Sequence, residues 1–366
     1  MTTDALKKTS LHSFHTSNGA RMVPFGGWDM PVQYSGILAE HLAVRSAAGL
    51  FDVSHMGEAM VSGADARPFL DYLVANDVSK MMPGRVLYTP MCYESGTVVD
   101  DLLIYCLSEN EFFLCINAGN TDKDIAWMTE QSKPFDCIVE NVSSAYCQLA
   151  IQGPKAETIL QKLVDVPLAD VSYYHFTEGE ICGCSAILSR TGYTGESGFE
   201  IYAPWERGST IAEALWGAGQ SEGMVLAGLG ARDSLRLEAG FPLYGHEISD
   251  ETTPFEGGIG WTVKLKKASG FIGKSALQEQ KRNGVPRRTI FYTMDDRRIA
   301  RAGTQVFCEE KVVGEVVSGT QSPILNRPIG SALIKTDFFS SENLEVDLRG
   351  KRYAIKQAKT PIHKNA

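Results

Sequence analysis

The predicted secondary structure changes character near residue 282, and this change constrains the fold more than any other feature of the chain. Before it, amphipathic helices alternate with strands joined by short turns, which is typical of α+β layers and not of a doubly wound parallel sheet. After the turn-rich, basic segment 282–288, only short strands follow at regular spacing. That spacing indicates a small β-barrel or sandwich. With 366 residues, the chain is long enough for two or three domains.

Hydrophobic periodicity and turn residues give the expected elements. In the first region we expect an antiparallel meander at residues 86–93, 97–106 and 111–117, and a hairpin at 184–189 and 198–203. Further strands are expected at 50–54 and 145–151, and helices at 37–48, 66–74, 121–132, 154–163, 209–217 and 232–239. In the last region the expected strands are 289–294, 303–307, 311–318, 330–334, 344–348 and 352–356.

Composition excludes several classes of protein. The chain carries 35 Lys and Arg against 44 Asp and Glu, a formal charge of -9, without a local basic stripe that could follow a nucleic-acid backbone. No apolar run is long enough to span a bilayer. The 8 cysteines and 7 histidines lack the spacings of a metal site. We therefore expect a cytoplasmic protein with reduced thiols and no metal, and no nucleic-acid or membrane partner.

Two adjacent acids lie within the strand-like segment at residues 97–105. Charged side chains inside an apolar strand are unfavourable to bury unless they are solvated or paired. Because strand side chains alternate between faces, Asp100 and Asp101 must point in opposite directions. At most one of them can therefore enter a given site. The alternative, that both lie at the rim of a sheet with one capping a turn, stays open on spacing alone.

A third acid, Glu200, lies between two apolar residues directly after a loop that contains three glycines. Gly192, Gly195 and Gly198 recur at three-residue intervals, which permits a compact loop with positive φ angles. The spacing matches neither the dinucleotide-binding fingerprint nor a phosphate-binding P-loop. Glu200 is therefore a candidate binding residue, with a position at the rim of a sheet as the alternative.

Another glycine turn, at residues 228–230, leads into the helix expected at 232–239. Backbone N–H groups at a helix start attract an anion, whereas a cation in the first turn is electrostatically disfavoured. The position of Arg232 in that first turn therefore predicts a compensating anion, such as a ligand carboxylate. The alternative is an Arg232–Glu or Arg236–Asp ion pair on a surface helix, worth well under ~1 kcal/mol.

Over nearly its whole length, the chain resembles the glycine cleavage T-protein family. The resemblance is carried, in order, by Met22–Trp28, Phe51–Met56, Asp100–Leu102, Gln152–Pro154, Thr191–Glu196, Gly230–Gly240, Leu243–Gly245 and Ser318–Pro323. It implies an α+β fold in which two folate-binding, ferredoxin-like subregions and a C-terminal all-β barrel are arranged around a central cavity. The expected domains are residues 1–48 with 140–280, residues 49–139, and residues 281–366.

The resemblance also implies roles for individual residues. Asp101 is expected to be catalytic and to approach the reactive nitrogens of the folate, Glu200 to hydrogen-bond the pterin amino group, and Arg232 to contact the other end of the ligand. The tail at residues 361–364 departs from the more aromatic tail of some members, which puts a folate contact there in doubt. Six further positions match folate-binding residues: Met56, Tyr88, Tyr105, Asn117, Tyr193 and Trp261.

The implied reaction transfers a one-carbon unit to tetrahydrofolate. Its donor is an aminomethyl group held as a thioether on the lipoyl arm of H-protein, and its products are methylenetetrahydrofolate, ammonia and the dihydrolipoyl arm. Two alternatives on the same scaffold are a folate-dependent demethylase of a methylated amine or sulfonium compound and a non-catalytic folate-binding relative. The Lys-Gly-Cys-Tyr-x-Gly-Gln motif of those non-catalytic relatives is absent from this sequence.

Overall fold

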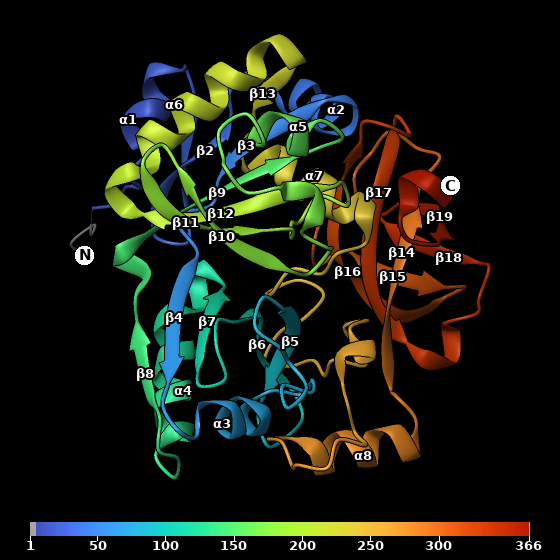
Figure 1. The fold of residues 1–366 in the computed structure, drawn as a ribbon. Coiled ribbons are helices and arrows are strands. Elements are labelled where there is room, and N and C mark those ends of the chain that lie inside the picture. Colours follow the sequence, from blue (N-terminus) through green and yellow to red (C-terminus); the bar gives the residue numbers. More distant parts are fainter. Residues whose placement is uncertain (1–4, 366) are drawn as a thin grey trace. The chain divides into compact units, whose positions relative to one another are not determined.

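The computed structural model describes residues 5–365 and divides into two compact units, each built from several segments of the chain (Figure 1). The first unit contains the chain up to Phe69 together with Lys80–Leu87 and Leu103–Arg232. The second contains Leu70–Ser79, Tyr88–Leu102 and the chain from Asp233 onward. The division into three domains that the sequence suggests stays a prediction.

A six-stranded sheet forms the centre of the first unit, in the order β10-β11-β12-β9-β3-β13. Its neighbours run antiparallel except β3 and β13, which are parallel. The expected hairpin is confirmed as β11 and β12. The strands are β3 (Ala48–Asp52), β9 (Tyr146–Gln152), β10 (Phe176–Ile181), β11 (Cys184–Ser189), β12 (Gly198–Pro204) and β13 (Met224–Leu226).

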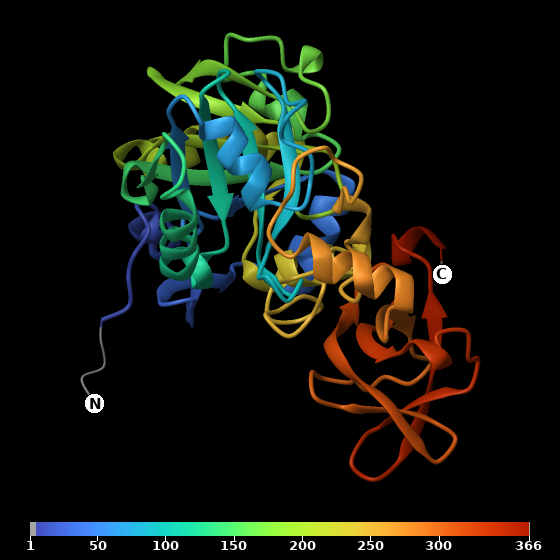
Figure 2. The ribbon, with the colours of Figure 1, turned by 90° about the horizontal axis from the view of Figure 1, so that it is seen from below.

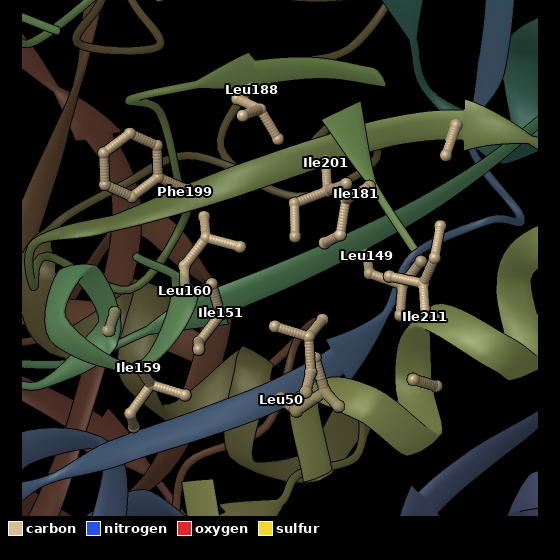
Figure 3. Packing of buried hydrophobic residues seen from close by; sticks show 14 of the residues in the cluster. Leu50, Leu149, Ile151, Ile159, Leu160, Ile181, Leu188, Phe199, Ile201 and Ile211 are labelled. Atoms are coloured by element: carbon tan, nitrogen blue, oxygen red, sulfur yellow. The ribbon is translucent and has the colours of Figure 1, made fainter. Parts of the chain in front are cut away.

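Helices cover one face of this sheet and close an apolar core (Figure 3). Ile151 and Ile201 from the strands meet Ile159 of α5 and Ile211 of α6, and all four are fully buried. Burying one such side chain contributes about 1.5–3 kcal/mol. α5 is shorter at both ends than the expected helix at 154–163. The helices of this unit are α1 (His12–Ser17), α2 (Ile37–Ser46), α4 (Thr121–Ser132), α5 (Ala156–Leu160) and α6 (Gly208–Gly219).

A second sheet has five strands in the order β5-β6-β7-β4-β8. The expected meander is confirmed, since β5, β6 and β7 are consecutive neighbours. β5 and β6 each run from one unit into the other. Within the first unit, Tyr105 and Phe113 of this sheet pack against Tyr202 of the six-stranded sheet. The strands are β4 (Gly57–Ser62), β5 (Val86–Cys92), β6 (Val98–Cys106), β7 (Glu111–Ile116) and β8 (Ile138–Asn141).

The second unit contains a closed barrel, in the order β14-β17-β16-β15-β18-β19, drawn in orange and red in Figure 2. The all-β region expected after residue 288 is therefore confirmed, and its strands enclose an apolar interior, with β17 buried along almost its whole length. The strands are β14 (Arg287–Thr293), β15 (Gln305–Cys308), β16 (Lys311–Ser322), β17 (Arg327–Lys335), β18 (Leu344–Asp347) and β19 (Arg352–Ala358).

The remaining elements connect these sheets. Helix α7 begins at Leu229, three residues before the expected start, because the backbone N–H of Arg232 already bonds the carbonyl of Gly228. No helix among the described residues is both long and apolar enough to cross a membrane. These elements are β1 (Arg21–Phe25), β2 (Trp28–Gln33), α3 (Ala66–Leu73), α7 (Leu229–Ala239), α8 (Lys274–Asn283) and α9 (Ile362–Asn365).

Candidate functional site

The two adjacent acids of β6 differ in exposure, as the alternation of strand side chains predicts. Asp100 is 0% exposed, whereas Asp101 is half-buried. The hydroxyl of Tyr88, on β5, donates a hydrogen bond of 2.8 Å to Oδ2 of Asp101. This bond fixes the direction of the Asp101 carboxylate. Asp101 is therefore the acid that can meet a ligand.

An aromatic pair accompanies Asp101 in the second unit. The rings of Tyr88 and Trp261 lie 6.0 Å apart between centroids, at an interplanar angle of 31°. Trp261 belongs to a short 3₁₀ turn, Gly260–Thr262, and is 64% exposed. Large exposed aromatic rings offer apolar area with little conformational freedom to lose, which suits a ligand-facing surface. We call Asp101, Tyr88 and Trp261 the acid cluster.

Glu200 lies on β12 in the first unit and is 6% exposed. Its Oε2 accepts a hydrogen bond of 2.5 Å from the hydroxyl of Thr191, and its Oε1 accepts one of 3.2 Å from Nε2 of Gln148. Burial raises the pKa of this carboxyl above its ordinary value, while the Thr191 hydroxyl and the charge of Arg232 act in the opposite direction. Each carboxylate oxygen has one donor and can accept another.

Gln148 extends this network into the interior. Its Nε2 also lies 3.0 Å from the hydroxyl of Tyr202, which in turn lies 2.9 Å from the hydroxyl of Tyr105. Tyr105 is fully buried among aromatic rings. The structure thus places Tyr105 behind Glu200, linked to it through Tyr202 and Gln148, and its contact with a ligand stays a prediction.

The guanidinium of Arg232 lies over the ring of Tyr193, 4.7 Å from the ring centroid. A guanidinium held over a tyrosine face gains a cation–π attraction of about 0.5–2 kcal/mol. Within the described part of the first unit, no carboxylate oxygen lies within 4.0 Å of this guanidinium. This guanidinium can therefore receive a ligand anion, whereas Arg236, the other arginine of the alternative, pairs with Oδ1 of Asp233 at 2.9 Å. We call Glu200, Thr191, Gln148, Arg232 and Tyr193 the carboxylate–arginine cluster.

The anion expected at the start of α7 is a residue of the chain itself. Oε2 of Glu40 accepts the N–H of Gly228 at 2.9 Å, and Oε1 accepts the N–H groups of Tyr34 and Gly36. Glu40 is 0% exposed. Glu40 thus satisfies the N–H of Gly228 without a ligand, and a ligand carboxylate can meet the Arg232 side chain.

Three further residues lie at the carboxylate–arginine cluster: Thr191 and His55, which belong to the family motifs, and Gln148, which the sequence analysis did not single out. Thr191 and Gln148 hold Glu200, and the only sequence signal for Gln148 is an amide within an apolar strand, which requires partners when buried. His55 is 3% exposed, and burial together with the charge of Arg232 lowers its pKa to about 4. Its imidazole is therefore neutral beside Arg232 at neutral pH.

The two remaining expected residues lie in the first unit. Met56 is half-buried and packs against the aromatic core between the two sheets. Asn117 is half-buried, and its carbonyl accepts the N–H of Asn120 at the turn that starts α4. The expected site residues thus gather in two places: Glu200, Arg232 and Tyr193 in the first unit, and the acid cluster in the second.

Comparison with known proteins identifies the family to which the chain belongs. Residues 11–267 match the family model of the GCVT N-terminal domain, and residues 287–364 match that of the glycine cleavage T-protein C-terminal barrel domain. The aminomethyltransferase of Desulfitobacterium hafniense is 50% identical over 347 residues, which are 94% of this chain and 95% of that protein. That of Lysinibacillus sphaericus is 48% identical over 370 residues, covering 100% of both.

Solved structures lead to the same family. The crystal structure of glycine cleavage system aminomethyltransferase T from Bartonella henselae matches with a TM-score of 0.91 and 34% sequence identity, and the match covers 98% of each chain. Both family models together span almost the entire sequence. The chain therefore belongs to the glycine cleavage T-protein family of aminomethyltransferases.

Proposed function

We propose that this enzyme transfers the aminomethyl carbon from the lipoyl arm of H-protein to tetrahydrofolate, with release of ammonia. The carbon–sulfur and carbon–nitrogen bonds of the donor break, and two carbon–nitrogen bonds to the acceptor form. The two protons that leave the acceptor nitrogens end on ammonia and on the dihydrolipoyl thiol. The atoms and electrons therefore balance without an oxidant or a reductant.

The carboxylate–arginine cluster supports this proposal because its hydrogen-bond acceptors and its guanidinium complement the donors and the carboxylates of a folate. Both oxygens of Glu200 can accept one more hydrogen bond, which suits the amino and ring N–H donors of a pterin. Arg232 offers a guanidinium to the carboxylates at the other end of the molecule. Tetrahydrofolate, when bound, supplies the two nitrogens that receive the carbon.

The acid cluster supports the chemical step. Asp101, oriented by Tyr88 at 2.8 Å, is a carboxylate that can orient a reacting nitrogen and stabilise positive charge that develops on the transferred carbon. Electrostatic stabilisation of this kind is stronger where water is excluded, and the rings of Tyr88 and Trp261 can exclude water beside the carboxylate. The proposal of one-carbon transfer rests on the hydrogen-bonded, half-buried Asp101, because folate binding alone does not require an oriented carboxylate at the reacting nitrogens.

The decisive experiment measures ammonia release from aminomethylated H-protein with and without tetrahydrofolate. We expect ammonia release to be fast only when tetrahydrofolate is present, with formation of an equal amount of methylenetetrahydrofolate. Unlipoylated H-protein is the control and should give no product. Turnover of a methylated amine or sulfonium compound without H-protein would instead identify a demethylase, and folate binding without any turnover would identify a non-catalytic relative.

A further inference from the structure

We infer that Gln152 is a positioning residue for folate binding. Its side-chain amide bonds two residues of the loop 191–195, and the loop held in this way keeps Tyr193 against Arg232. The inference rests on the proposed function, because it concerns the same carboxylate–arginine cluster. It assigns a role to the Gln152–Pro154 segment, which the site described above does not use.

The contacts of Gln152 join the two ends of a short stretch of loop. Gln152 is the last residue of β9 and is 1% exposed. Its Nε2 donates to the carbonyl of Thr191 at 3.1 Å, and its Oε1 accepts from the hydroxyl of Thr194 at 2.9 Å. One amide thus donates to Thr191, the residue that bonds Glu200, and accepts from Thr194. A carboxylate or an apolar side chain cannot do both.

The glycines of the loop make room for this amide. A Cβ atom added at Gly192 would lie 2.0 Å from Oε1 of Gln152, and one added at Gly198 would lie 2.5 Å from its Nε2. Of the three glycines in the loop, only Gly195 has a positive φ, of 78°. Gly195 thus supplies the positive φ angle that the spacing permits, whereas a side chain at Gly192 would meet the Gln152 amide, and one at Gly198 would meet both this amide and the backbone carbonyl of Ile151.

Arg45 makes a second contact with the loop, also at Thr194. Nη1 of Arg45 donates to the carbonyl of Thr194 at 2.7 Å and pairs with Oε1 of Glu196 at 2.9 Å. This contact joins the C-terminal end of the loop, from Thr194 to Glu196, to α2. The Gln152 amide is thus the contact that spans the residues on both sides of Tyr193, and Tyr193 in turn contacts Arg232 at 4.7 Å.

The first test removes one hydrogen bond of the Gln152 amide, either at Gln152 or at Thr194. Gln152→Glu loses the donor to the Thr191 carbonyl, and Thr194→Val loses the hydroxyl that donates to Gln152 while it keeps the branched shape. By calorimetric titration we expect either change to weaken tetrahydrofolate binding about tenfold, because a buried hydrogen bond is lost and a partner is left unpaired. In steady-state assays KM for tetrahydrofolate should rise by a similar factor, while kcat changes less than about threefold.

A matched control separates positioning from general loss of stability. Gln161 also braces a loop of the first unit, since its Nε2 donates to the carbonyls of Val164 and Val166 and its Oε1 accepts the N–H of Leu168. Gln161→Glu should lower the melting temperature without changing the affinity for tetrahydrofolate. Equal losses of affinity in the Gln152 and Gln161 variants would overturn the inference.

A double-mutant cycle tests whether Gln152 acts through Tyr193. Tyr193→Ala should weaken tetrahydrofolate binding, and in that background Gln152→Glu or Thr194→Val should add little, because the residue they position is already gone. Additive losses would show that Gln152 acts elsewhere and would overturn the inference. If the unaltered enzyme does not bind tetrahydrofolate, the proposed function itself fails; if it binds and the losses are additive, only the role of Gln152 fails.

Discussion

Asp101 and Asp100 are adjacent on β6, yet only Asp101 is half-exposed and oriented by Tyr88. We expect Asp101→Asn to keep the fold and bind tetrahydrofolate within a modest factor, but to lose about 10²–10³ in kcat, because it removes charge at the transition state. Asp100→Asn should lower the melting temperature and retain turnover. Steady-state ammonia release and thermal melts of both variants check this. If Asp100→Asn is the inactive variant, the assignment is reversed.

Glu200 should determine affinity more than chemistry. Glu200→Gln keeps the shape but loses the negative charge that faces Arg232, so we expect tetrahydrofolate binding to weaken by about 1.5–3 kcal/mol, the range for hydrogen bonds to a charged group. Calorimetric titration gives the affinity. Glu178→Gln, at an exposed position of β10, is the matched control and should bind like the parent. An unchanged affinity in Glu200→Gln would rule out the proposed pterin contact.

Among the elements, α1 is attached to β3 by one buried carboxylate. Asp52 accepts hydrogen bonds of 2.7 Å from both Thr9 Oγ1 and His15 Nε2, and one of 2.9 Å from the N–H of Ser54. Burial alone would raise the pKa of Asp52, but the hydrogen bond and charge of His15 and the other donors outweigh it and lower the pKa. The stabilisation is therefore present above the ordinary pKa of about 3.9 and is lost as pH falls through the lower folded value.

We expect Asp52→Asn to lower the free energy of unfolding at pH 7 by about 3–5 kcal/mol, the range for breaking a buried pair. Below about pH 4 the difference from the parent should shrink, because Asp52 of the unfolded parent takes up a proton there and the folded parent follows at its lower pKa. Denaturant unfolding at several pH values measures both effects. Asp29→Asn removes the more exposed partner of His12 on the same helix and should change stability little. Equal effects of the two substitutions would contradict the assignment.

For the whole molecule, one buried acid acts on stability in the opposite direction. Glu58 is 0% exposed, and within residues 5–365 neither of its carboxyl oxygens has a hydrogen-bond partner. Burial raises its pKa well above the ordinary value. The folded chain then holds a proton that the unfolded chain releases above about pH 4.3. Stability is therefore fully present below that pH and falls as pH rises through the folded pKa.

Glu58→Gln removes this titration while it keeps the shape of a neutral carboxyl group. We expect the variant to melt at a higher temperature than the parent at pH 8, with a difference that disappears towards pH 4. Thermal melts of both proteins between pH 4 and pH 9 give the comparison. A parent whose stability has the same pH dependence as the variant would contradict a protonated Glu58.

Local pattern in the sequence determined much of the fold and part of the site. Period-two alternation predicted the meander, the β11–β12 hairpin and the all-β C-terminal region, and it separated Asp100 from Asp101. These features could be predicted because they depend on side-chain direction and turn chemistry among neighbouring residues. The order of the motifs along the chain likewise predicted the family.

Tertiary structure alone decided which distant groups satisfy the buried polar atoms. Glu40 occupies the start of α7 from 188 positions away, and Gln152 fills the glycine loop from 39 and 42 positions away. No local period encodes such partners, because a buried amide, carboxylate or N–H accepts whichever complementary group the packing of sheets and helices brings within about 3 Å. The sequence therefore indicates where polar groups must be satisfied, and only the packed chain determines by which residue.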